Sequence, residues 1–172
     1  MSAIGRDRAG IVAAITDGLL EIDANVEDSR MTILGGHFAV MLLVATGDGR
    51  EREEVEAALS VPRERLGLEA LSVSEVGDAS EVHPSPDHVI TVYGSDHPGI
   101  VHSISSELAD AGVNITDLQT RLAGAQDKPI YVMMLEVELG ALAAGELERR
   151  LGEVAERTAV EVELRPLDAE AL

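Results

Sequence analysis

The chain of 172 residues contains one pattern twice, at a constant spacing of 89 residues. Gly5-Arg6-Asp7-Arg8-Ala9-Gly10-Ile11-Val12 aligns with Gly94-Ser95-Asp96-His97-Pro98-Gly99-Ile100-Val101. The same register continues without a gap through Ile15/Ile104, Leu19/Leu108, Asn25/Asn114, Val26/Ile115 and Asp28/Asp117. A repeat of this length indicates two small domains of roughly 85 residues each rather than one medium domain. We therefore predict a first domain at residues 1–76, a linker at residues 77–87, rich in Gly, Ser and Pro, and a second domain at residues 88–172.

In the second copy, the hydrophobic periodicity alternates between strand and helix in a definite order. Val89–Tyr93 is typical of a strand, and from Ile100 the apolar residues recur at helical spacing. Two further strands, a helix and a last strand follow. We expect the two strands at Ile115–Leu122 and, after a loop that contains Gly124, at Ile130–Val137. The helix is expected after Gly140, and the last strand from Val160. This order, β-α-β-β-α-β, predicts an α+β fold of the ferredoxin-like type, with an antiparallel sheet and both helices on one face.

The first copy has the same order, with one irregularity. The expected elements are a helix from about Gly10 to Ile22, strands at Val26–Ile33 and Phe38–Ala45 around a Gly35-Gly36 turn, a Glu-rich helix around Val55–Leu59, and a last strand near Leu71–Val76. Only Met1–Ile4 precede the repeated motif, which is short for an opening strand. We expect that the chain starts late, or that this edge of the sheet is borrowed or frayed.

Glycines and polar residues are repeated in the turn from the first strand into the first helix. We expect Asp7 and Asp96 to cap the following helix, and the N–H groups there to favour a carboxylate. Pro98 fits the first turn of a helix, because its missing N–H would have no partner there. We expect Asn25 and Asn114 to lie close to this turn, where an amide suits a zwitterionic ligand. Alternatively, the aspartates are only helix caps and the asparagines occupy left-handed turns.

The motif Gly-x-Asp-x-(Pro)-Gly-Ile-Val, followed by a helix and Asn-(Val/Ile)-x-Asp, resembles the ACT domain over nearly the whole chain. The tandem arrangement is similar to the glycine cleavage system transcriptional repressor group. The resemblance implies βαββαβ modules that bind small ligands, commonly amino acids, at interfaces formed by the strand-to-helix loop and the following asparagine. The ligand-binding residues that it implies are Arg6, Asp7, Gly10, Ile11 and Asn25 in the first copy, and Ser95, Asp96, His97, Gly99, Ile100 and Asn114 in the second. The first copy departs from the motif at Ala9, where the second has Pro98.

The resemblance further implies a non-catalytic regulatory protein that binds a small amino acid such as glycine or serine, needs no cofactor, and signals by contact within a homodimer or with a partner protein. The alternative is a ligand-free module for protein–protein interaction or dimerisation. An acylphosphatase-like enzyme would need an arginine beside its phosphate loop, and Arg6 is replaced by Ser95 in the second copy. We therefore expect no catalytic site.

The composition argues against several other classes of protein. The chain has no cysteine, which excludes disulfides, thiolate metal sites and cysteine nucleophiles. A net charge of −19, with two Tyr, one Phe and no Trp, disfavours direct binding to nucleic acid. His97 and His102 are badly spaced to share a metal on one helix face, so we expect no metal site. No apolar run approaches the length of a membrane span and no signal peptide is visible, so a cytoplasmic location is expected.

Overall fold

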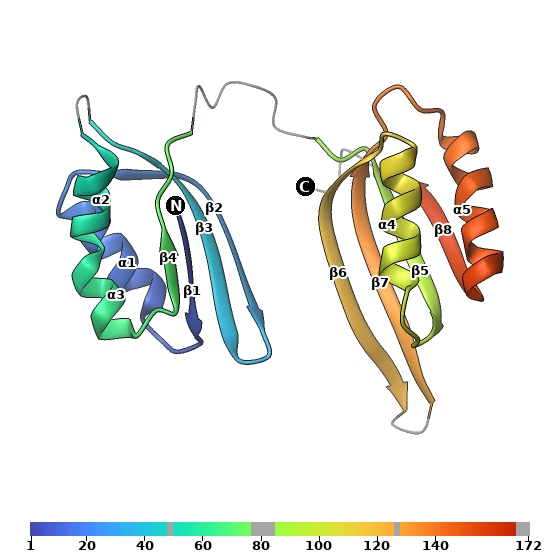
Figure 1. Ribbon diagram of the computed structural model, residues 1–172, viewed down its shortest axis with the longest axis horizontal. Helices are drawn as coiled ribbons and strands as arrows, with labels where there is room; N and C mark the ends of the chain where they lie inside the picture. Colours follow the sequence, from blue (N-terminus) through green and yellow to red (C-terminus); the bar gives the residue numbers. More distant parts are fainter. Residues whose placement is uncertain (48–49, 77–84, 126–127, 168–172) are drawn as a thin grey trace. The chain divides into compact units, whose positions relative to one another are not determined.

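The computed structural model describes residues 1–47, 50–76, 85–125 and 128–167, which form two compact units, Met1–Ala79 and Ser80–Leu172 (Figure 1). Residues 77–84, which make up most of the predicted linker, lie outside the described residues. Each unit has its own antiparallel sheet and its own hydrophobic core. Within the described ranges, no helix is long and apolar enough to cross a membrane.

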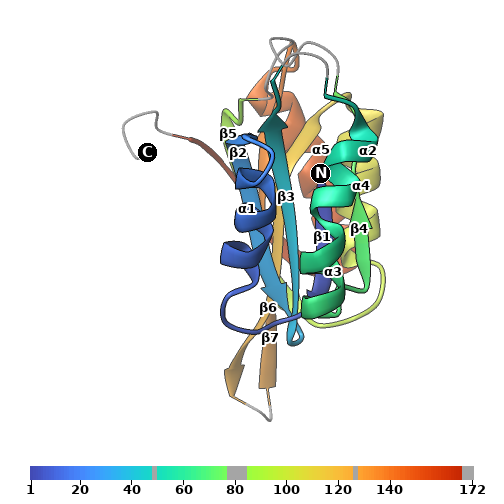
Figure 2. The same ribbon diagram turned by 90° about the vertical axis from the view of Figure 1, so that its left-hand side faces the viewer.

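The first unit is a four-stranded sheet with three helices. Its elements are β1 (Ser2–Arg6), α1 (Ile11–Leu20), β2 (Asn25–Leu34), β3 (His37–Ala45), α2 (Arg52–Ala58), α3 (Ser60–Leu66) and β4 (Ala70–Ser72). The strands lie in the order β2-β3-β1-β4, with every neighbouring pair antiparallel. Figure 2 shows the three helices together on one face of this sheet.

The second unit repeats this plan with two helices. Its elements are β5 (His88–Ser95), α4 (Ile100–Asp110), β6 (Asn114–Ala125), β7 (Lys128–Glu138), α5 (Ala144–Thr158) and β8 (Val160–Pro166). The strand order β6-β7-β5-β8 corresponds to that of the first unit strand for strand. The prediction of an α+β fold with two ferredoxin-like domains is therefore confirmed.

The opening strand of the first unit is neither frayed nor at an edge. β1 lies between β3 and β4, and Ser2–Arg6 pair residue by residue with Met41–His37 of β3. The Met1 ammonium donates a hydrogen bond of 2.7 Å to the Leu42 carbonyl, and its partial burial lowers its pKa. The strand is short, but hydrogen bonds to both neighbours hold it in place.

The Glu-rich helix expected around Val55–Leu59 is two short helices, α2 and α3. The reason is Pro62, because a helix continuing through this segment would need the N–H of residue 62 to donate to the Ala58 carbonyl. That bond cannot form, so α2 ends at Ala58 and α3 begins at Ser60.

Two strand boundaries also differ from the prediction. β4 ends at Ser72 instead of Val76, because Ser72 pairs with Ser2, the first residue of its partner strand β1. Gly124 lies inside β6, opposite Pro129, and not in the hairpin loop. The tip of this hairpin, residues 126–127, lies outside the described residues.

The repeat extends to details of backbone and packing. The register between β2 and β3 shifts between Val26 and Asp28, and the register between β6 and β7 shifts at the equivalent Ile115 and Asp117. Each repeated aspartate thus follows a β-bulge, an irregularity that bends the strand and increases its twist. The preservation of a bulge in both copies explains why the sequence register holds across this segment.

Asp87 joins the start of β5 to the end of β7. Its carboxylate accepts hydrogen bonds from the Leu139 N–H, at 3.1 and 3.3 Å, and lies 2.8 Å from His88 Nδ1. Burial raises the pKa of this carboxyl, but the hydrogen bonds from His88 and Leu139 outweigh that effect and leave the pKa lowered. A lowered pKa in the folded state contributes stability at pH values above the unfolded pKa, near 3.9.

We expect Asp87→Asn to reduce the unfolding free energy of the second unit by about 1 kcal/mol at pH 7, because the amide cannot replace the charged acceptor at this half-exposed site. The loss should shrink as the pH falls through the folded pKa, where the wild-type carboxylate is itself protonated. Urea unfolding between pH 2.5 and 7 measures both effects. Asp110→Asn, at the exposed end of α4, is the control and should change little. An equal loss at every pH would contradict this assignment.

Candidate ligand site

Each unit begins its first helix with a glycine in a left-handed conformation. Gly10 is the N-cap of α1 with φ of 90°, and Gly99 is the N-cap of α4 with φ of 101°. Glycine adopts this backbone without the steric penalty of a side chain, which accounts for its repetition. Neither N-cap has a side-chain hydrogen bond, so the prediction that Asp7 and Asp96 cap these helices is wrong. The aspartates lie three residues before the N-cap, too early to reach the N–H groups of the first turn by capping geometry.

Pro98 is also displaced from its predicted position. It immediately precedes the N-cap Gly99 and is therefore outside the first turn of α4. Among the described residues, no side chain caps the first-turn N–H groups of α1 or α4, and neither helix has an acidic residue in its first turn. Such N–H groups, together with the positive end of the helix dipole, favour an anion such as a carboxylate.

A cavity of about 240 Å³ adjoins the β1–α1 loop of the first unit. It lies between the start of α1 and strands β2 and β3, and its lining combines a carboxylate, a guanidinium and apolar side chains. The lining residues are Asp7, Arg8, Gly10, Ile11, Val12, Ala13, Met31 and Phe38. Its volume is below the roughly 300–1,000 Å³ of sites for drug-sized ligands, which suits a smaller molecule.

The second unit has a wider cavity of about 740 Å³ beside its β5–α4 loop. Its lining includes residues of β7 and β8 and no residue of α4. Its lining residues are Tyr93, Gly94, Ser95, Asp96, Pro129, Ile130, Ala159 and Glu161. Each cavity is lined by the repeated aspartate of its own unit, Asp7 in the first and the equivalent Asp96 in the second. Four apolar lining residues were not identified from the sequence motif, because they carry no polar group that would point to a ligand: Met31, Phe38, Pro129 and Ala159.

Asn25 and Asn114 lie far from the loops, and their predicted closeness to the turn is wrong. Asn25 starts β2 opposite Ala45, whereas Arg6, at the loop, pairs with His37 at the other end of β3. Eight residues of strand at about 3.3 Å each separate these two ends. The physical reason is that α1 runs back along the sheet, so the chain re-enters β2 at the end opposite to the β1–α1 loop. The second unit repeats this arrangement with Asn114 opposite Glu138.

The remaining predicted residues divide between the core and the sheet surface. Ile11 and Ile100 are buried core residues, although Ile11 also lines the smaller cavity. Arg6 is exposed and alternates with the buried Gly5, so it lies on the sheet face that the helices leave uncovered. Ser95 is exposed at the end of β5 and lines the larger cavity.

His97 does not line the cavity of its unit, but contacts the end of α5. Its Nε2 lies 2.8 Å from the Thr158 carbonyl oxygen, and its Nδ1 lies 3.1 Å from the Pro98 carbonyl oxygen. Both carbonyls raise the pKa of His97, Pro98 more than Thr158, and the nearby charge of Asp96 raises it further. Its counterpart in the first unit, 89 residues earlier, is Arg8, whose Nη2 donates a hydrogen bond of 2.7 Å to the Arg65 carbonyl in the last turn of α3.

Arg8 was missed by sequence reasoning because its counterpart is a histidine and the two do not look alike. The sequence did offer one signal for Arg8: arginine and protonated histidine are both cations that can donate hydrogen bonds. In the part of the chain that the structure describes, no three His, Asp or Glu side chains converge as a metal site would require.

Comparison with known proteins gives consistent results for both units. A family model described as ACT domain matches residues 1–71 and 87–165. The glycine cleavage system transcriptional repressor of Escherichia coli (strain K12) is 27% identical over 138 residues, covering 80% of this chain and 71% of that protein. A UPF0237 protein of Methanopyrus kandleri is 38% identical over 76 residues, covering 41% of this chain and 80% of that protein.

Two solved structures resemble the chain over almost all of its length. An unknown protein from Galdieria sulphuraria has a TM-score of 0.77 at 29% identity and covers 96% of this chain and 95% of its own. The crystal structure of a proposed glycine cleavage system transcriptional repressor has a TM-score of 0.73 at 18% identity, with coverages of 96% and 94%. At that identity, the second likeness is one of fold.

Proposed function

Because the chain belongs to the ACT domain family, we propose that it is a regulatory protein whose modules bind a small amino acid, such as glycine or serine. It is a tandem ACT-domain protein related to the glycine cleavage system transcriptional repressor. The observation that carries the proposal is the combination, in both units, of an uncapped helix N-terminus with an exposed aspartate three residues before it. This combination offers partners for both charges of a zwitterion.

In the proposed complex, the amino-acid carboxylate accepts hydrogen bonds from first-turn N–H groups of α1 or α4. The ammonium lies against the carboxylate of Asp7 or Asp96. The N–H groups and the dipole favour the negative end of the ligand, and the aspartate favours the positive end. The smaller cavity beside Asp7 is lined by Phe38 and Met31, which leaves little space for a large side chain.

An asparagine that contacts this ligand has to come from a neighbouring ACT module, such as one in a homodimer. Asn25 and Asn114 lie at the sheet end opposite to the loop of their own unit. A ligand held in this way would favour one arrangement of paired modules over another. A preference of about 1–3 kcal/mol is enough for regulation, and a partner protein would read the change by contact.

A thermal-shift screen of the protein against the twenty amino acids tests the proposal. A ligand that binds only the folded state, at 100 times its dissociation constant, stabilises that state by about 2.7 kcal/mol. We expect a selective shift with a small amino acid, lost in Asp96→Asn and Asn114→Ala when the second module binds it. Asp110→Asn, an exposed acid away from the loop, should retain the shift. A flat response to all twenty amino acids would rule the proposal out.

The alternative of a ligand-free interaction module is favoured by a different observation. Equivalent positions on the uncovered sheet faces carry exposed apolar side chains in both units: Ile4 and Tyr93 in the first strands, and Met41 and Met134 in the third. If Met41→Lys with Met134→Lys alters self-association in light scattering, and no amino acid shifts the melting temperature, this alternative replaces the sensor.

A further inference from the structure

The loop that carries the proposed site is attached to the end of the last helix in each unit. We name this attachment the loop–helix tether: the hydrogen bond from Arg8 to the Arg65 carbonyl in the first unit, and from His97 to the Thr158 carbonyl in the second. Residues 8 and 97 are equivalent in the repeat. The contact is made twice by different residue types, so it is a shared feature of the two units rather than an isolated contact.

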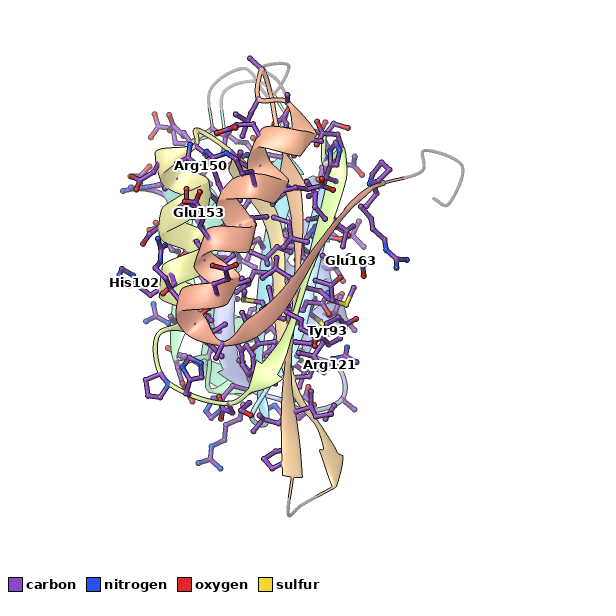
Figure 3. All side chains as sticks on the ribbon, turned by 90° about the vertical axis from the view of Figure 1, so that its right-hand side faces the viewer. Tyr93, His102, Arg121, Arg150, Glu153 and Glu163 are labelled. Atoms are coloured by element: carbon purple, nitrogen blue, oxygen red, sulfur yellow. The ribbon has the colours of Figure 1, made fainter. Side chains whose placement is uncertain are left out.

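Both acceptors are carbonyls that a helix leaves without an intrahelical partner. Arg65 is in the last turn of α3, and Thr158 is the last residue of α5. Such carbonyls form the negative end of the helix dipole, where a cationic donor is favoured. In the second unit, the Arg150 guanidinium of α5 is paired at 2.5 Å with Glu107, which links α5 to α4. Figure 3 shows Arg150 on the ribbon of α5.

The two tethers differ in their response to pH. Arginine keeps its charge at all accessible pH values. The two ring nitrogens of His97 both lie within hydrogen-bond distance of carbonyl oxygens, which can only accept. A neutral imidazole has one N–H, whereas the protonated ring has two and can donate to both carbonyls. Only the charged form of His97 therefore satisfies both contacts at once.

The charged groups near His97 either favour its protonated ring or lie toward other side chains. Asp96, its neighbour in the loop, favours the charged ring. Arg157, in the last turn of α5, is directed toward Glu107, 4.0 Å away. Glu161, two residues after the helix C-cap, lines the same cavity as Asp96 from β8.

We propose that Arg8 and His97 are positioning residues that hold the loop of each proposed ligand site against the last helix of its module, and that deprotonation of His97 loosens the loop of the second module alone. The tether itself does not depend on the proposed function, but its effect on ligand affinity rests on it. Because the folded state raises the pKa of His97, the ring donates to both carbonyls below the ordinary histidine pKa of about 6.5, and one of these two hydrogen bonds is lost as the pH rises through the folded value.

The first test measures the ring titration and the loop together, without any ligand. NMR titration of the full chain gives the pKa of His97, and amide hydrogen exchange of residues 96–101 and 159–160, corrected for its intrinsic pH dependence, gives the protection of the loop. We expect a pKa above 6.5 and a loss of protection across that same titration, about tenfold for each unit of elevation. An ordinary pKa, or protection that does not follow the titration, would overturn the proposal.

Exchange of the two residue types makes the test specific. His97→Arg should keep the second loop protected at high pH, and Arg8→His should transfer the pH dependence to residues 7–12 of the first unit. Neither variant removes a donor, so both should fold. His102→Arg is the matched control, since His102 is exposed on α4 (Figure 3), and it should leave the wild-type pH dependence unchanged. If Arg8→His leaves the first loop insensitive to pH, the tether has no positioning role.

A separate measurement links the tether to ligand binding. For whichever amino acid shifts the melting temperature, calorimetric titration at pH 6 and pH 8.5 should show weaker binding to the second module at the higher pH in the wild type, and equal binding in His97→Arg. A screen without any binder would remove the proposed function and leave the exchange result standing. Binding with no pH difference between wild type and His97→Arg would remove only the tether's role in affinity.

Discussion

Replacement of Ile104 by alanine is expected to lower the unfolding free energy of the second unit by about 2–5 kcal/mol. Ile104 is fully buried in α4, within the core cluster that includes Ile90, Leu108 and Met133. Truncation removes the transfer free energy of three carbon groups and leaves a cavity that a sheet-and-helix core can close only in part. A unit of about 85 residues has little stability to spare, so this one change should unfold a large share of the molecules.

Ile15→Ala provides the matched comparison, because Ile15 is the equivalent residue of α1 and is also buried. Each unit has its own core, so each variant should lower the unfolding transition of its own unit. Hydrogen exchange followed by mass spectrometry, read separately over residues 1–76 and 88–167, distinguishes the two. If Ile104→Ala lost protection equally in both segments, the view that each core stabilises its own unit would be wrong.

Replacement of Gly94 by alanine is expected to destabilise the second unit by about 1–3 kcal/mol through overpacking. Gly94 pairs with Val160 across β5 and β8, and a Cβ on Gly94 would lie 2.8 Å from Val160 Cγ1 and 3.2 Å from its Cβ. A branched side chain at that distance cannot move aside, since its Cβ is fixed to the strand backbone. The equivalent Gly5 has looser contacts, with the nearest atom, Leu68 Cδ2, at 3.2 Å, so Gly5→Ala should cost less.

Three further variants make this prediction specific. Gly152→Ala introduces the same side chain in α5, where a Cβ would meet nothing within 4 Å, and should stabilise the unit by about 0.8–1.0 kcal/mol. In a Val160→Ala background the shortest contact is gone, so Gly94→Ala should cost less than it does in the wild type. Chemical denaturation of the wild type, the three single variants Gly94→Ala, Gly152→Ala and Val160→Ala, and the double variant Gly94→Ala/Val160→Ala measures these differences. A cost for Gly94→Ala that is the same in both backgrounds would show that Val160 is not the cause.

The order of helices and strands could be predicted from the sequence because it depends on signals spread over many residues. The alternation of Val160, Val162 and Leu164 with acidic residues identified β8, and the helical spacing of Ile100, Ile104 and Leu108 identified α4. The repeat supplied each identification twice. Where one residue decided the outcome, the prediction failed: Pro62 divided a helix, and the position of Ser2 set the end of β4.

The candidate site was harder to predict because its geometry depends on where chain segments return in space. The motif correctly selected Asp7 and Asp96 as loop residues, but the helix start at Gly10 and Gly99 removed their capping role. The asparagines were placed wrongly because they follow the loop closely in the motif, whereas α1 runs along the sheet between them and carries the chain to its opposite end. Arg8 was overlooked because its counterpart is a histidine, and because its acceptor, the Arg65 carbonyl, is a backbone atom 57 residues away that the sequence motif does not include.

The two hairpins differ in length in a way that has a practical use. Leu34 pairs with His37 around a two-residue turn, whereas the equivalent pair Ala123 and Ile130 is followed by two further pairs, up to Ala125 and Lys128. The longer hairpin of the second unit is visible in Figure 1. It gains two residues on each strand, and because a strand alternates faces with a period of two, Met41 and Met134 stay on the same face of their sheets. A peptide tag or fluorescent reporter could therefore be grafted at the Gly35-Gly36 turn if strand residues are added in pairs. An odd number of residues added to one strand would move its side chains to the opposite face of the sheet.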